Sequence, residues 1–108
     1  MERSGRFEVS RDGELLIARF EGYLSAEAGE QSAAAFLEAM GQDDVVAIFD
    51  IREMAGYASE ARRSWAAALK PRRQQMLRLE LIGGNALVRM GGSVLAALLG
   101  VPVVNREA

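Results

Sequence analysis

Residues 45–65 read VVAIFDIREMAGYASEARRSW and join two predicted elements through a short connection. The first seven, VVAIFDI, form an almost unbroken apolar run with β-branched side chains, which is typical of a strand covered on both faces in a parallel sheet. After a short loop, residues 60–70 show helical spacing of the apolar side chains Ala61, Trp65, Ala68 and Leu69. The stretch therefore predicts a strand, a loop and a helix, which is the repeating unit of α/β folds.

The residues before this stretch predict a hairpin and a helix. Residues 6–12 alternate apolar and polar side chains, Asp12-Gly13 suits a tight turn, and residues 14–21 continue as a second strand. Ser25 can cap the helical pattern that follows it, AEAGEQSAAAFLEAM, and Gly41 can close that helix.

The residues after the stretch predict a strand, a helix and a short edge strand, at 77–82, 86–99 and 101–104. Pro71 ends or kinks the helix over 60–70, because proline has no N–H to donate to the preceding turn. Pro102 is tolerated at a sheet edge.

The predicted order is β-β-α-β-α-β-α-β within one domain spanning residues 1–108. Strands that alternate with helices favour right-handed crossovers and a mainly parallel sheet. The N-terminal hairpin adds one antiparallel edge. The sequence thus predicts a small α/β domain with a mixed, mainly parallel sheet.

The composition excludes several kinds of active site. The 108 residues include no Cys and no His, so a Ser-His-Asp triad, a thiol nucleophile and a zinc site built from His or Cys are ruled out. Asp43, Asp44, Asp50 and Glu53 are too dispersed to predict a metal site. We expect no enzyme activity and no cofactor. The missing disulfides and the polar start, MERSGRFEVS, favour a cytoplasmic protein without a transmembrane segment.

The charge is unevenly distributed along the chain. Residues 1–50 hold four Arg against eleven Asp and Glu, whereas residues 51–108 hold nine Lys and Arg against four Glu. Such asymmetry raises the question of an anionic partner. Nucleic acid is disfavoured, because the net charge is −2 and the spacing places Trp65 in the core rather than among the basic residues.

Ser59 stands where the second helix is predicted to begin. Its hydroxyl can cap that helix by accepting a hydrogen bond from the first turn. The same position lies beyond the carboxyl end of a strand, where α/β proteins meet their ligands and partners, and where a phosphate is stabilised by free amides. A role as nucleophile is disfavoured, because the chain has no histidine to activate it.

Basic residues follow Ser59 at Arg62, Arg63, Lys70, Arg72, Arg73 and Arg78. They suit a solvated helix face. They also suit contact with an acidic protein surface, and Lys70, Arg72 and Arg73 suit contact with an anion or a lipid headgroup.

The helix over 86–99 contains Gly91 and Gly92, each of which weakens a helix by roughly 1 kcal/mol relative to alanine. Close approach of this helix to the sheet or to another chain would compensate. Residues 94–104, VLAALLGVPVV, form an apolar run after these glycines, and this run predicts either core or a surface for self-association. The turn at 83–85 lacks the GxGxxG spacing and the Walker lysine, so it does not predict a nucleotide site.

The element order, together with VVAIFDIREMAGYASEARRSW and LRLELIGGNALVRMGG, resembles the STAS domain of bacterial anti-sigma factor antagonists. The resemblance is closest to the SpoIIAA-like branch grouped as STAS/SEC14. In that family an apolar strand ends in Asp, matched here by Asp50, and a short loop leads to Asp-Ser-Ser-Gly. Ser59 falls on the serine that a partner kinase phosphorylates in the family, with Ala58, Glu60 and Ala61 in place of its neighbours.

The resemblance implies a non-enzymatic regulatory module that binds a protein partner, such as a kinase or another signalling protein. Ser59 would be the contact or modification point, flanked by Tyr57, Arg62 and Arg63. Two alternatives stay open. One is a small apolar or lipid ligand held between sheet and helices, as the SEC14 side of the resemblance suggests. The other is a homo-oligomeric scaffold formed through the C-terminal apolar segment.

Overall fold

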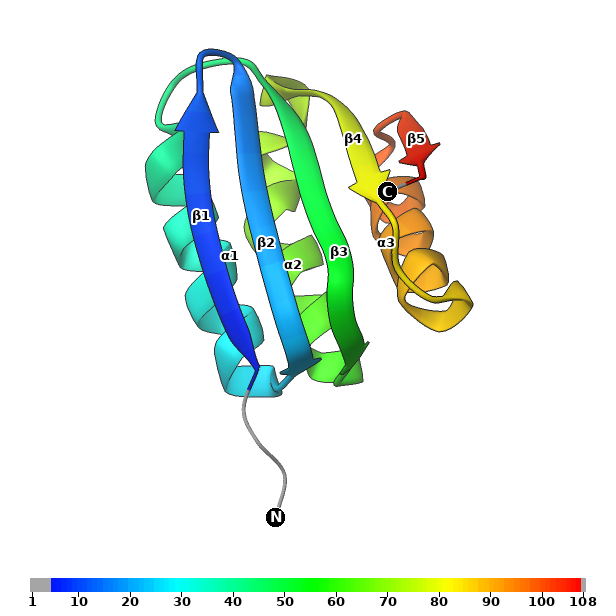
Figure 1. Cartoon of the computed structure of the whole chain (residues 1–108). Coiled ribbons are helices and arrows are strands. Elements are labelled where there is room, and N and C mark those ends of the chain that lie inside the picture. Colours follow the sequence, from blue (N-terminus) through cyan, green and yellow to red (C-terminus); the bar gives the residue numbers. More distant parts are fainter. Residues whose placement is uncertain (1–4, 108) are drawn as a thin grey trace.

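A computed structural model describes residues 5–107, and over this range it confirms the predicted element order (Figure 1). The elements are β1 (Arg6–Asp12), β2 (Leu15–Leu24), α1 (Ala26–Met40), β3 (Val45–Tyr57), α2 (Ser59–Leu69), the 3₁₀ helix η1 (Lys70–Gln75), β4 (Met76–Ile82), α3 (Ala86–Leu99) and β5 (Val103–Arg106). None of the helices in this range is long and apolar enough to cross a membrane.

The sheet has the spatial order β1-β2-β3-β4-β5, with β1 antiparallel to β2 and the other neighbours parallel. Because each crossover returns to the next strand in the same direction, right-handed connections place all three helices on one face, as Figure 1 shows. The prediction that both faces of this strand are covered is confirmed, because residues 45–51 are all buried, although helices lie on only one of the two faces. Val46 and Ile48 are nevertheless buried, and they lie in register beside Ile17, Arg78 and Glu80 of the adjacent strands.

Strand β3 is longer than predicted. It pairs with β4 only as far as Asp50, but it stays paired with β2 as far as Tyr57 through two irregularities in register. The sequence analysis ended this strand at residue 51, because Arg52 and Glu53 interrupt the apolar run. Both side chains are exposed, which a strand with one unpaired edge tolerates. The segment expected to be a loop is thus the end of a strand.

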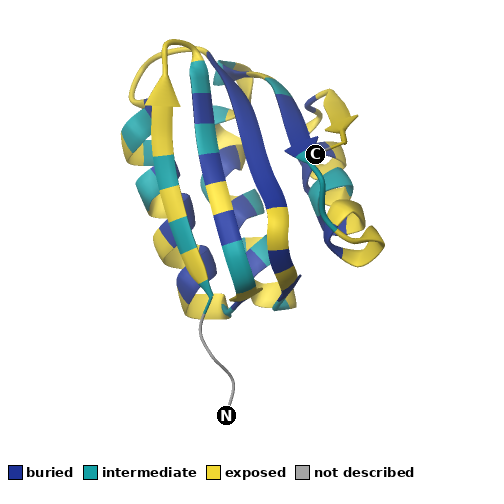
Figure 2. Ribbon diagram, viewed as in Figure 1, coloured by how far each residue is buried: buried dark blue, intermediate teal, exposed yellow. Residues whose placement is uncertain are grey.

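The core lies between the sheet and the helices (Figure 2). Its centre is an aromatic cluster of Phe20, Phe36, Phe49 and Trp65, whose ring centroids lie 5.0–6.0 Å apart in edge-to-face contacts. The Trp65 Nε1–H donates to Ser32 Oγ at 3.0 Å, which satisfies the polar atom of a side chain that is otherwise apolar. Of the predicted inner positions of α2, Ala61, Trp65 and Leu69 are buried, and Ala68 is partly buried against the core.

The predicted helix ends are confirmed at α1 and α3. Ser25 Oγ accepts from the Ala28 N–H and Asn85 Oδ1 accepts from the Val88 N–H, while Gly41 and Gly100 close the two helices at positive φ. Helix α2 ends at Leu69, and the chain continues as η1 with a proline in its first turn.

Strand β5 begins two residues later than predicted. Pro102 cannot donate to the ladder, so it precedes the strand, although its carbonyl accepts from the Leu79 N–H at 2.8 Å. All four residues of β5 are exposed, as expected of a short edge strand.

Candidate functional site

The start of α2 lies at the edge of the sheet where the parallel strands β2 and β3 end, at the bottom of Figure 1. Tyr57 is the last residue of β3, and Ser59 is the first of α2. The structure therefore places Ser59 beyond the carboxyl ends of parallel strands, as predicted from the sequence.

The prediction that Ser59 caps α2 is wrong. Ala58 is the capping residue, with extended backbone angles of φ −77° and ψ 144° and no side-chain hydrogen bond. Its carbonyl accepts from the Ala61 N–H at 3.0 Å and from the Arg62 N–H at 3.4 Å. Because β3 continues to Tyr57, only one residue separates strand from helix, and this residue takes the cap position.

Ser59 is exposed in the first turn of α2, and its hydroxyl forms no side-chain hydrogen bond with any residue in the range 5–107. Glu60 and Arg63 are exposed beside it, whereas Tyr57 and Arg62 are partly buried. The predicted site residues thus form two groups. Ser59 and Arg63 face solvent, while Tyr57 and Arg62 face the interior.

Tyr57 and Arg62 line a cavity of about 50 Å³ between the sheet, α2 and α3. The cavity walls are otherwise apolar or aromatic, and they include Trp65, Leu81, Val88 and Leu95. This is the place, between sheet and helices, where the sequence analysis put the alternative small ligand.

The glycines of α3 bring that helix close to the sheet, as predicted. A Cβ atom on Gly91 would lie 2.5 Å from Cζ of Tyr57, and one on Gly92 would lie 2.8 Å from Cδ2 of Leu81. At these distances a side chain on Gly91 or Gly92 would require Tyr57 or Leu81 to shift.

The basic residues do not form a single patch. Arg62 and Lys70 are eight residues apart on α2 and its continuation, which corresponds to roughly 12 Å along a helix axis. Lys70, Arg72 and Arg73 therefore lie at the opposite end of α2 from Ser59.

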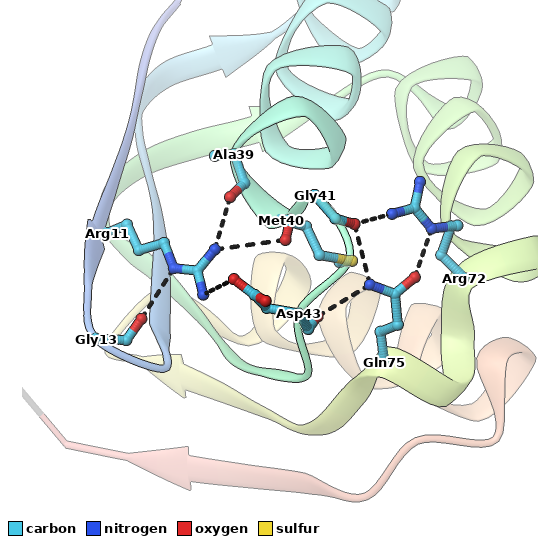
Figure 3. A network of polar contacts seen from close by, with 8 residues as sticks. All are labelled: Arg11, Gly13, Ala39, Met40, Gly41, Asp43, Arg72 and Gln75. Carbon is cyan, nitrogen blue, oxygen red and sulfur yellow. Dashed lines mark hydrogen bonds and ion pairs between the residues drawn. The ribbon is translucent and has the colours of Figure 1, made fainter.

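Arg72 takes part in a network that closes the C-terminal end of α1 (Figure 3). Its guanidinium donates to the Gly41 carbonyl and, through Nε, to Gln75 Oε1 at 2.6 Å. From the other side, Arg11 donates to the Ala39 carbonyl at 2.9 Å and pairs with Asp43 at 2.8 Å. Arg73 donates to the Lys70 carbonyl at 2.8 Å. The structure thus gives Arg72 and Arg73 contacts that stabilise the fold.

Glu80 is a buried carboxylate that the sequence analysis missed. Its side chain is 3% exposed and lies 2.7 Å from Arg78 Nε and 2.9 Å from Arg106 Nε. Arg106 is on β5, so its ion pair with Glu80 holds the edge strand to β4. The segment LRLELI alone does not predict that Glu80 is buried and paired, because its partner Arg106 is distant in sequence.

Asp50 lies within β3 rather than at its end. The Arg52 side chain donates to both of its carboxylate oxygens, at 2.9 and 2.7 Å, and these hydrogen bonds hold the pKa of Asp50 below its ordinary value. Within the part of the chain that the structure describes, Asp and Glu residues form no group that could hold a metal ion.

The outward face of α3 carries a row of large apolar side chains. Leu87, Met90, Val94 and Leu98 are 57%, 56%, 36% and 59% exposed. We call this row the α3 outer stripe. Val94 and Leu98 belong to the run VLAALLGVPVV, for which the sequence predicted core or a surface for self-association, whereas Leu87 and Met90 precede that run.

No protein-family model matches this chain, and no curated protein matches it. Solved structures that share its fold include the following two. An uncharacterized protein of the DUF3478 family with a SpoIIAA-like fold, from Shewanella loihica PV-4, is 19% identical with a TM-score of 0.72, over 97% of this chain and 87% of that one. The anti-sigma factor antagonist SpoIIAA, in its unphosphorylated form, is 19% identical with a TM-score of 0.63, over 92% and 87%.

These likenesses extend over nearly the whole of both chains and confirm the fold that the sequence resemblance implied. The chain has a SpoIIAA-like, STAS-type fold.

Proposed function

We propose that this chain is a non-enzymatic regulatory module of the bacterial cytoplasm that binds a protein partner through the start of α2. The fold it shares with an anti-sigma factor antagonist supports this proposal. The contact surface would consist of Ser59, Glu60 and Arg63, all of which are exposed. The partly buried Tyr57 and Arg62 would pack beneath this surface.

The observation that carries the proposal is the unused hydroxyl of Ser59. Ala58 occupies the cap position, so the Ser59 side chain is not required to begin the helix. An exposed serine that has no structural task can be modified without damage to the fold.

A phosphate on Ser59 would be stabilised by the N–H groups and the dipole of the first turn of α2. It would add nearly two negative charges to the surface. A partner that fits an uncharged serine at this point would then be repelled. We therefore propose that phosphorylation of Ser59 by a partner kinase releases the partner.

The test is a pull-down from source-cell lysate with wild-type, Ser59→Asp and Ser10→Asp baits, with the intact mass of each bait recorded. Ser10 is exposed on β1, far from α2 in the sheet order, so it controls for added charge alone. We expect one protein to bind wild type and Ser10→Asp but not Ser59→Asp, and the wild-type bait to carry one phosphate. Equal capture by all three baits would refute a switch at Ser59.

The α3 outer stripe supports a second proposal, self-association of two copies. A two-fold interface requires a surface that complements itself. In an antiparallel pair of α3 helices, Leu87 would meet Leu98 and Met90 would meet Val94, because both pairs are centred near residue 92. None of these four side chains is charged.

Sedimentation equilibrium tests the second proposal directly. We expect a mass of twice 11.7 kDa for wild type and a monomer for Leu98→Glu. The exposed Leu77→Glu on β4 is the matched control, and it should remain a dimer. A monomeric wild type, or a Leu98→Glu variant that still dimerises, would refute the proposal.

A further inference from the structure

Oxidation by a peroxide can reach only a few kinds of side chain in this protein. The chain has five methionines and no cysteine, so a peroxide meets no thiol. The thioether of methionine is then the side chain that such an oxidant attacks, and the methionine sulfoxide that forms can be reduced again. Which methionine reacts first depends on its access to solvent.

Met90 differs from the other described methionines in its exposure. Met40, Met54 and Met76 are 0%, 8% and 4% exposed, whereas Met90 is 56% exposed. Met1 lies outside the described residues. Met90 is therefore the methionine within residues 5–107 that an oxidant in solution reaches first.

Met90 belongs to the α3 outer stripe, whose other members are Leu87, Val94 and Leu98. In the antiparallel pair of α3 helices proposed above, each Met90 meets Val94 of the second copy. None of the four side chains of the stripe can donate a strong hydrogen bond. An oxygen atom added to the Met90 sulfur would therefore be buried in the interface without a donor from the stripe.

We propose that oxidation of Met90 by hydrogen peroxide dissociates the dimer and that reduction of the sulfoxide restores it. The thioether sulfur attacks one peroxide oxygen, and the O–O bond breaks as the S–O bond forms. The other oxygen leaves as hydroxide and takes up the proton of the first to become water. Sulfur is thereby oxidised and the peroxide is reduced. This inference rests on the self-association proposed above and not on a protein partner at Ser59.

Association and oxidation compete for Met90. In the dimer the second copy covers the thioether, so the oxidant reaches it in the free monomer. Met90 should thus be oxidised more slowly at protein concentrations above the dimer dissociation constant than below it. A dimer of the oxidised chain would bury two oxygens that lack donors, and we expect its dissociation constant to be at least about thirtyfold higher.

The test is sedimentation equilibrium of the full chain before and after brief treatment with hydrogen peroxide, with each added oxygen located by peptide mass mapping. We expect the oxygen on Met90 ahead of Met40, Met54 and Met76. At one protein concentration, the chain should be a dimer before treatment and a monomer after it. Methionine sulfoxide reductases, one for each epimer, should restore the dimer.

The outcomes separate this inference from the self-association on which it rests. An untreated protein that is already a monomer would refute both. A dimer that persists with Met90 fully oxidised would overturn this inference alone. Oxidation of the buried methionines as fast as Met90 would also overturn it, because exposure would then not select the site.

Two variants assign the effect to the Met90 sulfur. Met90→Leu keeps an apolar side chain of similar volume, so it should remain a dimer with or without peroxide, although Met1 is still present. Met90→Gln places a polar group at the same point and should be a monomer without any oxidant. A Met90→Leu protein that dissociates on treatment, or a Met90→Gln protein that dimerises like wild type, would overturn the proposal.

Discussion

The three helices form two neighbouring pairs, α1 with α2 and α2 with α3. In the first pair a glycine allows the two helices to approach closely, whereas beside the second a glycine allows α3 to approach the end of β3. Gly29 of α1 faces Ala61 of α2, where an added Cβ would lie 2.5 Å from the Ala61 Cβ. Gly91 of α3 faces the ring of Tyr57 at the same distance. The packing around these two contacts differs.

On the α1–α2 side, four aromatic rings fill the space beneath the helices, and the one indole N–H in this cluster has its acceptor. On the α2–α3 side, a cavity remains, the Nε of Arg62 is buried without an acceptor in the described range, and α3 exposes large apolar side chains. The first pair therefore packs around a cluster of aromatic rings, whereas the second leaves a cavity and an exposed apolar surface. We propose that stability and binding are divided between these neighbouring parts of one small domain.

The largest expected difference between the two sides concerns Phe36 and Leu95. Phe36→Ala removes a fully buried ring that contacts two others and should lower the free energy of unfolding by about 3–5 kcal/mol. Leu95→Ala borders an existing cavity and should cost about 2–3 kcal/mol. Urea denaturation followed by circular dichroism measures both. A larger loss for Leu95→Ala would reverse the comparison.

The paired glycines give the next largest difference. Gly29→Ala brings a methyl group against the Ala61 backbone, which cannot move aside, so overpacking should cost about 1–3 kcal/mol. Gly91→Ala meets the far end of the Tyr57 ring, which can rotate, and the gain in helix propensity offsets part of the strain. We expect a change within about 1 kcal/mol for Gly91→Ala by urea denaturation. Equal losses at both positions would show that α3 packs as tightly as α1.

The edge strand beside α3 depends on Glu80. Arg106→Ala removes one of its two ion pairs, and because Arg106 is about half exposed, we expect a loss of about 1 kcal/mol. Arg19, whose pair with Glu21 is longer and exposed on both sides, is the control and should lose about 0.5 kcal/mol or less on Arg19→Ala. If the two variants lost the same amount in urea denaturation, burial of Glu80 would contribute nothing to holding β5.

The smallest expected effect is an acid dependence from Asp50. Its pKa is lowered in the folded state by the Arg52 hydrogen bonds, so its contribution to stability is present above the ordinary value of 3.8 and is lost as the pH falls through the folded-state pKa. Between pH 5 and about pH 3, wild type should lose more stability than Asp50→Asn, by less than about 1 kcal/mol because Arg52 is exposed. If the free energy of unfolding changed with pH in the same way in both proteins, Asp50 would make no such contribution to stability.

Element order, most helix ends and the buried face of α2 could be predicted from the sequence, because each depends on local spacing and on residues such as Ser25, Gly41 and Asn85. The length of β3 could not, since residues 51–57 are held by pairing with β2 on one side only. The mistaken cap at Ser59 followed from that error, because the end of the strand decides which residue caps the helix.

The candidate site was only partly predictable. The position of Ser59 beyond the strand ends follows from the strand-loop-helix pattern. The contact of Arg72 with the end of α1 does not, because it depends on how η1 packs beside Gly41, 31 positions earlier in the chain. Glu80 and its partner Arg106 are 26 positions apart, so only the parallel pairing of β4 with β5 brings them together.

Native-state hydrogen exchange, resolved by residue, tests most directly whether the α1–α2 side of the molecule is more tightly packed than the α2–α3 side. We predict that amides in the middle of α1 and α2 open only with global unfolding. Those in the middle of α3 should open at a free energy lower by at least about 1–2 kcal/mol. Amides of α3 as well protected as those of α1 would contradict the account, because the recognition side would then be as firmly packed as the core.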